Sequence, residues 1–333
     1  MSFRLRCLFV LLFLAAASAL YVFLTLEKQI VFYDKYIFSG EKEDVKGKSY
    51  AINKQSVSYY ISDSCHVNID KDDSNAIKDS AGVKMHSRPD GGVYYHPVNM
   101  MQWSLRLLCA YDNTKDPRYL MKAGKHAEKL SDIAHVIDGL PYFPYEFDFK
   151  VWGYDEALMK APWYSGMAQG QALSLYSLLY SYTGEKKWLE AADKVFSTLL
   201  RGRENSPDVW VSYMDDSGYF WIEEYPMDRH PSNVLNGFLF AVFGVYDYYS
   251  VTSNVNALDM LNKSLNTVEY YGSKWRVVGN KSFYDLKYHR RANRGYHQLH
   301  IKQLKYLYKI TNDKFFFTLS EDFIKDFNKK PAR

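Results

Sequence analysis

Cysteine, excess charge and phosphate-binding glycine motifs are all scarce in this chain of 333 residues. Its 3 Cys residues are too few for a disulfide scaffold. The 42 basic and 38 acidic residues leave a net charge of only +4, and no polybasic tail is present. This balance argues against binding of nucleic acid through bulk charge. Glycine-rich phosphate loops, Cys-x-x-Cys pairs and Gly-x-Ser-x-Gly elbows are absent.

The few cysteines have different expected states. Cys7 lies in an apolar leader, so Cys65 and Cys109 are the one pair that could join. Cys109 falls in an apolar helical pattern, and we expect it to be a free buried thiol.

The leader at residues 7–26 carries no charge and follows Arg4 and Arg6. About 20 apolar residues span a bilayer, and flanking positive charge stays in the cytoplasm. We therefore expect a single-pass anchor, with the remaining chain outside the cytoplasm in a Golgi lumen or a bacterial periplasm. Ala17-Ser18-Ala19 resembles a cleavage site, and the alternative is a secreted protein. We favour the anchor because the apolar run continues through Leu26.

Composition divides the rest of the chain into two parts. Residues 27–90 are polar and interrupted, which predicts a stalk and a small β region with Tyr59-Tyr60-Ile61 as its best strand. Residues 91–333 show helical periodicity and should form one catalytic domain. The expected domains are thus 1–26, 27–90 and 91–333.

A repeat marks the helical part. Thr114, Thr183, Thr252 and Thr311 are spaced by 69, 69 and 59 residues, and each separates two helical patterns. A hydrophobic residue follows each Thr by five positions, and the second helices are amphipathic. This predicts four helical hairpins.

The first helix of each hairpin is apolar around most of its circumference, which is typical of a helix buried on several sides. We therefore predict a mostly α fold, an incomplete α/α toroid of about eight helices. The long connections at 136–165, 201–230 and 273–295 should meet at one rim, beside the N-termini of the inner helices. Because helix N-termini attract anions, we expect a cleft there for a negatively charged ligand.

The residues at these junctions favour a sugar ligand. Tyr, acids and amides concentrate there, and flat aromatic rings with polar tips suit sugar rings. His297 and His300 lack a third neighbouring ligand, so we predict no metal and no cofactor.

Several motifs at these junctions resemble the glucuronyl C5-epimerases of heparan sulfate biosynthesis. The similarity runs from about Tyr94 to the C-terminus. It is carried by three groups of motifs: the Ala-Gln-Gly-Gln segment ending at Gln171; Glu223-Glu224-Tyr225-Pro226 followed by Leu235-Asn236-Gly237; and Tyr284-Asp285-Leu286 with Tyr296-His297.

The resemblance implies an α/α-barrel domain that converts D-glucuronate to L-iduronate within a polysaccharide. The catalytic candidates that match the family motifs are Glu224, Tyr225, Tyr284 and Tyr296. The expected substrate-binding residues are His96, Asn99, Gln102, Trp163, Gln169, Gln171, Asn236, Lys287, Arg290, Arg294 and His297.

The chain departs from the family in two ways. Vertebrate members have a larger β-rich N-terminal portion, whereas about sixty residues stand in its place here. They also have Arg where this chain has Lys287, so we expect either looser recognition of the carboxylate by Lys287 or recognition by Arg290 or Arg294. The expected partners are an anionic uronate polysaccharide and a membrane, but not nucleic acid, and the anchor is compatible with a homodimer.

Inversion at C5 requires one proton-transfer group on each face of the sugar. An ionised phenol is a stronger base than an ordinary carboxylate. Our hypothesis is that Glu224 or Tyr225 serves one face and Tyr284 or Tyr296 the other. The alternatives are a polysaccharide lyase, an inactive glycan-binding protein, or a glycoside hydrolase that would use two of Glu146, Asp155, Glu224 and Asp285.

Overall fold

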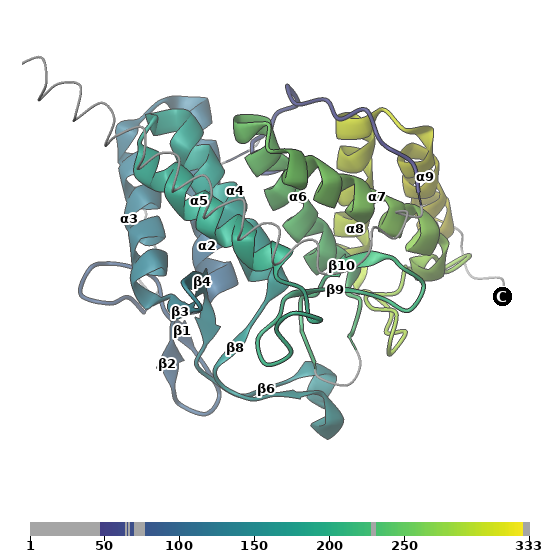
Figure 1. The fold of residues 1–333 in the computed structure, drawn as a ribbon, viewed down its shortest axis with the longest axis horizontal. Helices are drawn as coiled ribbons and strands as arrows, with labels where there is room; N and C mark the ends of the chain where they lie inside the picture. Colours follow the sequence, from purple (N-terminus) through teal and green to yellow (C-terminus); the bar gives the residue numbers. More distant parts are fainter. Residues whose placement is uncertain (1–46, 64, 66, 70–76, 228–230, 329–333) are drawn as a thin grey trace, which may run out of the picture. The chain divides into compact units, whose positions relative to one another are not determined.

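The computed structural model describes residues 47–63, 65, 67–69, 77–227 and 231–328, and this part holds eight α-helices, α2–α9 (Figure 1). The predicted anchor lies outside the described residues, so it and the domain boundaries stay predictions. Among the described helices, none has the length and apolar character needed to cross a bilayer.

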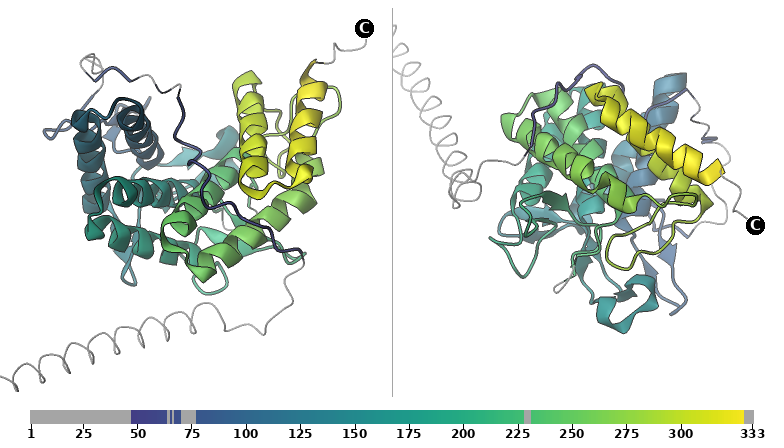
Figure 2. Two further views of the ribbon diagram at one scale, coloured as in Figure 1. Left: turned by 90° about the horizontal axis from the view of Figure 1, so that it is seen from above. Right: turned by 90° about the vertical axis from the view of Figure 1, so that its right-hand side faces the viewer.

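The described helices form four consecutive hairpins, which confirms the predicted repeat. The inner helices are α2 (Pro97–Thr114), α4 (Gly166–Thr183), α6 (Leu235–Thr252) and α8 (Arg294–Thr311). The outer helices are α3 (Pro117–Ile133), α5 (Lys186–Leu200), α7 (Val255–Trp275) and α9 (Lys314–Asn328). Seen along the helices, the hairpins follow an arc that is open between α2 and α8 (Figure 2).

Burial on all sides is found in two of the four inner helices, α4 and α6. The inner helices α2 and α8, at the ends of the arc, bury about half of their residues, so the all-round burial predicted for them was wrong. Every residue of α6 from Leu235 to Tyr248 is buried, and so is every residue of α4 from Gly166 to Ser177. The outer helix α5 instead buries one stripe, which includes Trp188. A helix that is apolar on all sides must be covered on all sides, so α4 and α6 occupy the middle of the arc.

All four hairpins turn in the same way. The hydroxyl of each repeat Thr donates to the carbonyl four residues earlier, at 2.7 Å in every case. The same oxygen accepts the N–H two residues later. The residue after each Thr is left-handed and donates to the carbonyl of a Tyr, which closes the helix. One Thr per repeat thus ends one helix and orders the turn into the next.

The backbones of α4 and α6 touch. A Cβ on Gly170 would lie 2.2 Å from Ala241 Cα, and one on Gly244 would lie 1.9 Å from the Gly170 carbonyl oxygen. Neither position has room for a larger residue. The Gly in the Ala-Gln-Gly-Gln motif therefore serves helix packing.

Residues 47–63, which we call the crossing segment, close the arc at the end where the Thr turns lie (Figure 2). Lys48 N donates to Asn266 of α7 at 3.1 Å, and Asn53 N donates to the Ile310 carbonyl of α8 at 2.8 Å. Ser58 then donates to Asp247 of α6 at 3.0 Å. The segment thus bonds to three neighbouring helices, α6, α7 and α8.

Aromatic rings of the crossing segment fill the centre of the arc. Tyr59 stacks on Phe243 with ring centroids 4.5 Å apart and meets Tyr306 of α8 edge-on at 5.3 Å. Tyr60 packs over Phe240. Residues 59–61 form no strand, so that prediction was wrong, because these side chains pack between helices and the backbone has no neighbouring strand to pair with.

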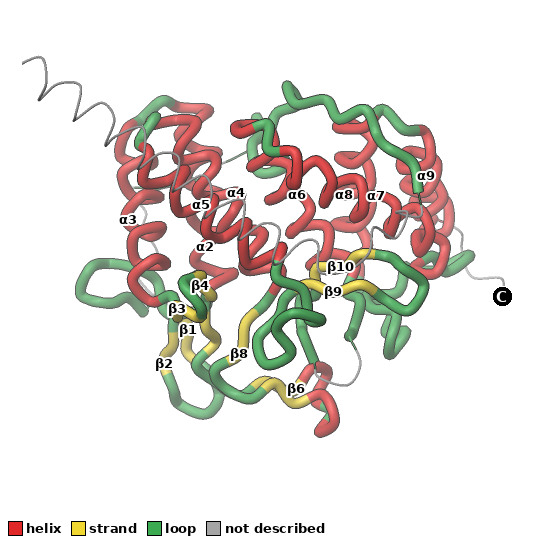
Figure 3. Tube along the Cα trace, viewed as in Figure 1, coloured by secondary structure: helices red, strands yellow, loops and turns green. Residues whose placement is uncertain are grey.

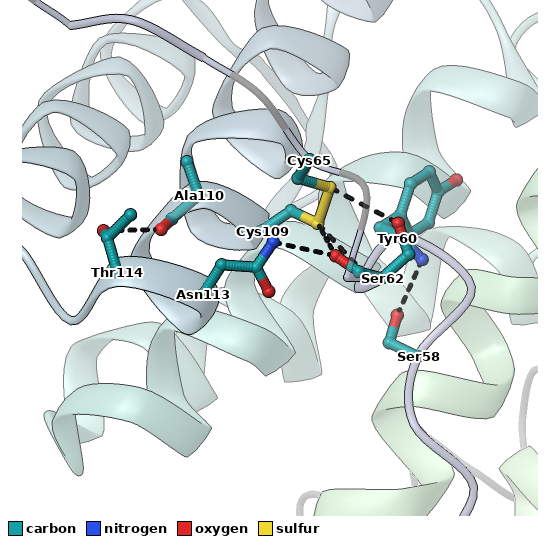
Figure 4. Close-up of a disulfide and its surroundings, with 8 residues drawn as sticks. All are labelled: Ser58, Tyr60, Ser62, Cys65, Cys109, Ala110, Asn113 and Thr114. Atoms are coloured by element: carbon teal, nitrogen blue, oxygen red, sulfur yellow. Dashed lines mark hydrogen bonds between the residues drawn. A yellow bond between two sulfur atoms is a disulfide. The ribbon is translucent and has the colours of Figure 1, made fainter.

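A disulfide between Cys65 and Cys109 fastens the chain just past the crossing segment to α2 (Figure 4). Ser62 N also donates a hydrogen bond to Cys109 Sγ at 3.2 Å, and Asn113 donates to the Ser62 carbonyl at 2.9 Å. The expected free thiol at Cys109 was therefore wrong. The pairing depends on how the crossing segment is routed, which the local pattern around Cys109 does not encode.

The strands are short and lie in the long connections at the N-terminal end of the inner helices (Figure 3). They form five antiparallel pairs in the described part of the chain. The pairs are β1 (His86–Ser87) with β2 (Val93–Tyr94), β3 (His135–Ile137) with β4 (Leu140–Tyr142), β5 (Pro144–Tyr145) with β8 (Trp163–Tyr164), β6 (Phe149–Lys150) with β7 (Leu158–Met159), and β9 (Ser212–Met214) with β10 (Phe220–Ile222). The long connections thus gather on one rim, as predicted.

Removing the disulfide should lower stability. Cys65 and Cys109 are 44 residues apart, and crosslinks of this kind contribute about 2–4 kcal/mol. We expect Cys109→Ala to lower the free energy of unfolding by that amount in urea titrations. Reduction should have the same effect on the wild-type protein and no further effect on the variant. Equal stability of the wild-type protein and the Cys109→Ala variant, each with and without reductant, would contradict a structural role for the crosslink.

Packing of α4 on α6 makes a second stability prediction. Gly244→Ala should destabilise the protein by about 1–3 kcal/mol, because the new methyl group overlaps backbone atoms of α4. The matched control is Gly124→Ala in α3, where the nearest atom is 3.8 Å away. That change should stabilise by about 0.5–1 kcal/mol through helix propensity. Thermal unfolding that shifts both variants in the same direction would contradict the close contact.

Candidate active site

A cavity of about 660 Å³ lies inside the arc, toward the N-terminal ends of the inner helices. Tyr59 and Tyr60 of the crossing segment border it from the opposite end. The walls come from all four inner helices and from the connections that lead into them. The cavity therefore forms only when all four hairpins are assembled.

Eight of the predicted site residues line this cavity. They are Glu224, Tyr225, Tyr296, His96, Asn99, Gln102, Trp163 and Asn236. Tyr284 lies directly behind Tyr296, with ring centroids 4.8 Å apart. All four predicted catalytic residues thus meet at one place, although Glu224 and Tyr225 precede α6, Tyr284 precedes α8, and Tyr296 lies in the first turn of α8.

Hydrogen bonds to Glu223 fix the strand end that carries Glu224. Gly166 N donates to the Glu223 carbonyl at 2.8 Å, at the start of α4. The buried Glu223 carboxylate accepts from Ser232 Oγ at 2.7 Å and from Asn233 N at 2.9 Å. With Glu223 held on the packed side, its neighbour Glu224 faces the cavity.

Glu224 is almost completely buried, with 8% of its surface exposed. A Cβ on Gly237 would lie 2.1 Å from its Oε2, so the carboxyl group rests against the first turn of α6. Oε2 has no hydrogen-bond partner among the described residues. Burial raises the pKa of Glu224 to about 8, assisted by the charge of Glu223 and opposed by a hydrogen bond from Tyr225. Its proton is therefore exchangeable near neutral pH.

The neighbouring phenols hold their protons more tightly. Tyr284 is 4% exposed, and burial together with the charge of Glu224 raises its pKa well above the usual value. The same two causes raise the pKa of Tyr296, which is 39% exposed and borders the cavity. Tyr284 is placed by Leu235 N, which donates to its carbonyl at 3.1 Å. At neutral pH these phenols are hydrogen-bond donors and acids.

An aromatic wall runs along one side of the cavity. Tyr145 stacks on Trp163 with ring centroids 3.9 Å apart, and Phe147 meets Tyr145 edge-on at 5.7 Å. Trp163 also lies 6.1 Å from Tyr225, which continues the wall to the acid. These rings pack largely on one another and are buried, so they give the cavity an apolar side of small exposed area.

His96 supplies a fixed polar group on the α2 side. Its Nδ1 accepts the Asn99 N–H at the start of α2, which leaves the proton of the neutral ring on Nε2. Burial lowers the pKa of His96 to about 4, and the charges of His86 and Arg88 add to the effect. His96 is thus an uncharged donor at neutral pH.

Groups of the protein already occupy the helix N-termini that we expected to receive a substrate anion. His96 caps α2, Asn293 caps α8, and Glu224 lies against the first turn of α6. Gly166 N of α4 is bonded to Glu223. The N-terminal N–H groups that we expected to bind a substrate anion are therefore bonded in part to acceptors of the protein itself, because the connections fold back onto the helix ends.

Three predicted contacts lie away from the cavity in the packed interior. Gln169 bonds to Phe143 N, to the Pro141 carbonyl and to Thr198, and so fixes a connection to α4 and α5. Gln171 is fully buried beneath Tyr60. His297 accepts from Ser282 N at 3.0 Å and packs against Phe323. These residues pack inside the ring and are not among the residues that line the cavity.

The three cations predicted to bind the carboxylate also lie elsewhere. Lys287 borders two other hollows, Arg290 lies over the ring of Trp152, and Arg294 lies over Phe327. The basic stretch faces outward because its connection is pinned to α6 through the backbone of Tyr284.

Sequence reasoning missed several residues that line the cavity. They are Tyr59, Tyr60, His86, Arg88, Val98, Arg106, Tyr145, Phe147, Phe149, Ser165, Met167, Phe240 and Leu299. Tyr145 belongs to a junction rich in Tyr, and that signal was available. Arg88 and His86 fall in the region interpreted as a stalk and a small β region, where no pattern pointed to a site.

Glu224 is the one carboxylate among the described residues that line the cavity. Glu146 pairs with His135 at 3.0 Å outside it, and Asp155 is exposed. The described residues also contain no group of three His, Cys, Asp or Glu that could hold a metal ion. The arrangement provides one carboxyl group and several phenols.

Comparison with known proteins relates the chain to a family. The family model for the D-glucuronyl C5-epimerase C-terminus matches residues 138–325, more than half of the chain. An uncharacterized protein of Methanocaldococcus jannaschii is 26% identical over 172 residues, which are 52% of this chain and 53% of that protein. The D-glucuronyl C5-epimerase of Caenorhabditis elegans is 29% identical over 169 residues, 46% of this chain and 27% of that protein. The chain thus matches about half or less of each relative.

A solved structure shares the fold. A sugar epimerase from a ruminal bacterium superposes with a TM-score of 0.52 at 11% identity and covers 89% of this chain and 82% of its own. This likeness confirms the α/α-toroid type of fold.

The raised pKa of Glu224 makes a prediction about stability. The folded protein binds more protons than the unfolded chain between the ordinary glutamate pKa of 4.5 and about 8. The free energy of unfolding should therefore fall as pH rises through this window, by a few kcal/mol. In Glu224→Gln the fall should be smaller, as measured by urea unfolding at pH 5 to 9. Identical pH profiles would show that Glu224 ionises at its ordinary pKa.

Proposed function

Because the chain belongs to the D-glucuronyl C5-epimerase C-terminus family, we propose that it is a carbohydrate epimerase that inverts C5 of a uronate within a polysaccharide. The more specific proposal is conversion of D-glucuronate to L-iduronate in a heparosan-type glycan. The observation that carries it is the cluster of one buried carboxyl group, Glu224, with three phenols at the edge of the cavity.

Glu224 is the proposed base. Within the cluster its pKa of about 8 is the lowest, so it loses its proton before any phenol does. A carboxylate with a raised pKa is also a stronger base than an ordinary one, which suits a weak carbon acid. This assigns the base to the carboxyl group, where the sequence had favoured an ionised phenol.

Tyr296 is the proposed acid on the other face of the sugar. Its hydroxyl-bearing ring borders the cavity, and its raised pKa keeps it protonated until a proton is needed. Glu224 takes the C5 proton, the charge moves onto the sugar carboxylate, and Tyr296 returns a proton to C5 from the opposite side. The enzyme is left with a protonated Glu224 and an ionised Tyr296, and exchange with solvent restores both.

Polar donors must stabilise the charge that develops on the carboxylate. Tyr225 and Asn236 border the cavity next to Glu224, and Asn236 lies in the first turn of α6. Tyr284 interacts with both Asn236 and Tyr296, so we assign it the role of positioning these groups.

A glucuronyl substrate is supported by the name of the Caenorhabditis elegans relative, and the aromatic wall beside the acid is compatible with a sugar chain. The predicted anchor would place the protein where secreted glycans are assembled, and this part of the proposal rests on the leader alone.

A glycoside hydrolase fits the cavity less well, because its usual mechanism needs two carboxyl groups across the bond. Asp285 is buried at the backbone of Tyr288, and no second carboxylate borders the cavity in the described part of the chain. A lyase shares the first step with the epimerase, and product analysis separates the two.

The decisive experiment uses the full chain, N-acetylheparosan and deuterated water. We expect deuterium at C5 together with iduronate signals in the NMR spectrum. An unsaturated product would indicate a lyase, shortened chains a hydrolase, and an unchanged bound polymer a binding protein. Because Glu224 must be ionised to act as base, kcat/KM should rise with pH around a midpoint near 8. A rate that falls through this range would contradict the assignment.

Variants test the two proton-transfer groups. Glu224→Gln and Tyr296→Phe should each lower C5 exchange by about 10²–10⁴. Matched controls on the outer surface are Glu128→Gln in α3 and Tyr270→Phe in α7, which should retain the wild-type rate. Retained exchange in Tyr296→Phe, with thermal stability unchanged, would remove Tyr296 from the mechanism.

A further inference from the structure

The proposed substrate is an anion, but the reacting end of the cavity already holds a buried acid. The Arg residues described at the cavity lie on its α2 side. Among the described residues that line it, the Lys and Arg side chains are Arg88 and Arg106. The polar residues Asn99, Gln102 and Arg106 follow one another along the α2 face of the cavity. One side of the hollow is therefore suited to negative charge.

Arg88 is held in place before any ligand arrives. Its guanidinium carbon lies 4.1 Å from the centroid of the Phe147 ring, and Nη2 donates to the Asp148 carbonyl at 3.2 Å. Its Nε lies 3.5 Å from Asp90 Oδ2, too far for a strong hydrogen bond. The Arg88 side chain is 20% exposed, whereas that of Asp90 is 51% exposed. A planar guanidinium fixed on a ring binds oxyanions with little loss of side-chain freedom.

Arg88 is separated from Glu224 by the aromatic wall. Phe147 beneath the guanidinium lies 6.4 Å from Trp163, and Trp163 lies 6.1 Å from Tyr225. The electrostatics agree with this separation. The charge of Arg88 lowers the pKa of His96, whereas the pKa of Glu224 is set by burial, by Tyr225 and by Glu223.

We propose that Arg88 binds an acidic group on a sugar that adjoins the reacting uronate. The reacting ring lies between Glu224 and Tyr296, and the glycan continues along the wall of Tyr145, Phe147 and Trp163 toward Arg88. The protein therefore acts on an oligosaccharide that carries a second negative group.

This inference rests on the proposed function, because the reacting sugar is placed by Glu224. Two sources supply the same oxyanion chemistry, the carboxylate of a further uronate or an N-sulfate on an amino sugar. Because the aromatic wall separates Arg88 from the base Glu224, Arg88 should affect substrate binding more than proton transfer. Arg88 therefore acts as a specificity residue. His96, with its donor on Nε2, lies beside it.

The test compares Arg88→Ala and Arg88→Lys with the wild-type full chain. The matched control is Arg291→Ala. Arg291 also lies over a ring, Phe283 at 4.9 Å, and also donates to a backbone carbonyl, but it is not among the residues that line the cavity. The probes are heparosan hexasaccharides in N-acetylated and N-sulfated forms. The readouts are KM and kcat for C5 deuterium exchange, and Kd from calorimetry at two salt concentrations.

We expect Arg88→Ala to raise KM and Kd about tenfold, with kcat within about twofold of wild type and a weaker salt dependence. Arg88→Lys should recover part of the loss, and Arg291→Ala should match the wild-type protein. A loss confined to the N-sulfated probe would identify the sulfate as the bound group, and an equal loss with both probes would identify the carboxylate.

Failure of this inference is distinguishable from failure of the proposed function. Normal exchange with an unchanged KM in Arg88→Ala would overturn the role of Arg88 and leave the epimerase proposal intact. Binding that depends on Arg88 without any C5 exchange would overturn the epimerase and retain the anion site. A wild-type protein that neither binds nor exchanges would overturn both.

Discussion

The contact between the backbones of α4 and α6 is the constraint from which the site follows. Gly170 and Gly244 let the two helices approach until a side chain on either would collide with the other helix. Because the pair is this close, the N-termini of α4 and α6 lie side by side, and the segment of Glu223 and Glu224 passes over both of them. The glycines therefore allow the close pairing of α4 and α6 over which the acid is held.

Burial gives Glu224 its chemistry. A carboxyl group in water loses its proton at low pH, but here desolvation and the neighbouring Glu223 raise its pKa to about 8. The same burial raises the pKa of the phenols still further. The order of the pKa values, acid below phenols, divides the roles: the carboxyl group accepts a proton and a phenol gives one. Neither role could be assigned from residue types alone.

An incomplete ring needs something to close it. Four hairpins leave a gap between α2 and α8, and the crossing segment fills it with Tyr59 and Tyr60, held by the disulfide of Cys65 and Cys109. These rings border the cavity at the end that holds the Thr turns. The part of the chain that looked least structured in the sequence thus helps to form the site.

The sequence by itself determined the four hairpins, the Thr turns and the rim on which the long connections gather, because these depend on local periodicity. It also predicted the meeting of Glu224, Tyr225, Tyr284 and Tyr296, because the motifs that carry them lie at that rim although they are far apart along the chain. Only the tertiary structure decided that Cys109 is paired and that Gln169 and His297 pack in the interior. It also decided that, among the described residues, the cations that line the cavity are Arg88 and Arg106 in place of Lys287, Arg290 and Arg294. The physical reason is that long-range routing determines which side of a connection is buried: backbone bonds pin Tyr284 to α6 and turn the basic stretch outward, while the β1 region folds in over α2 and brings Arg88 with it.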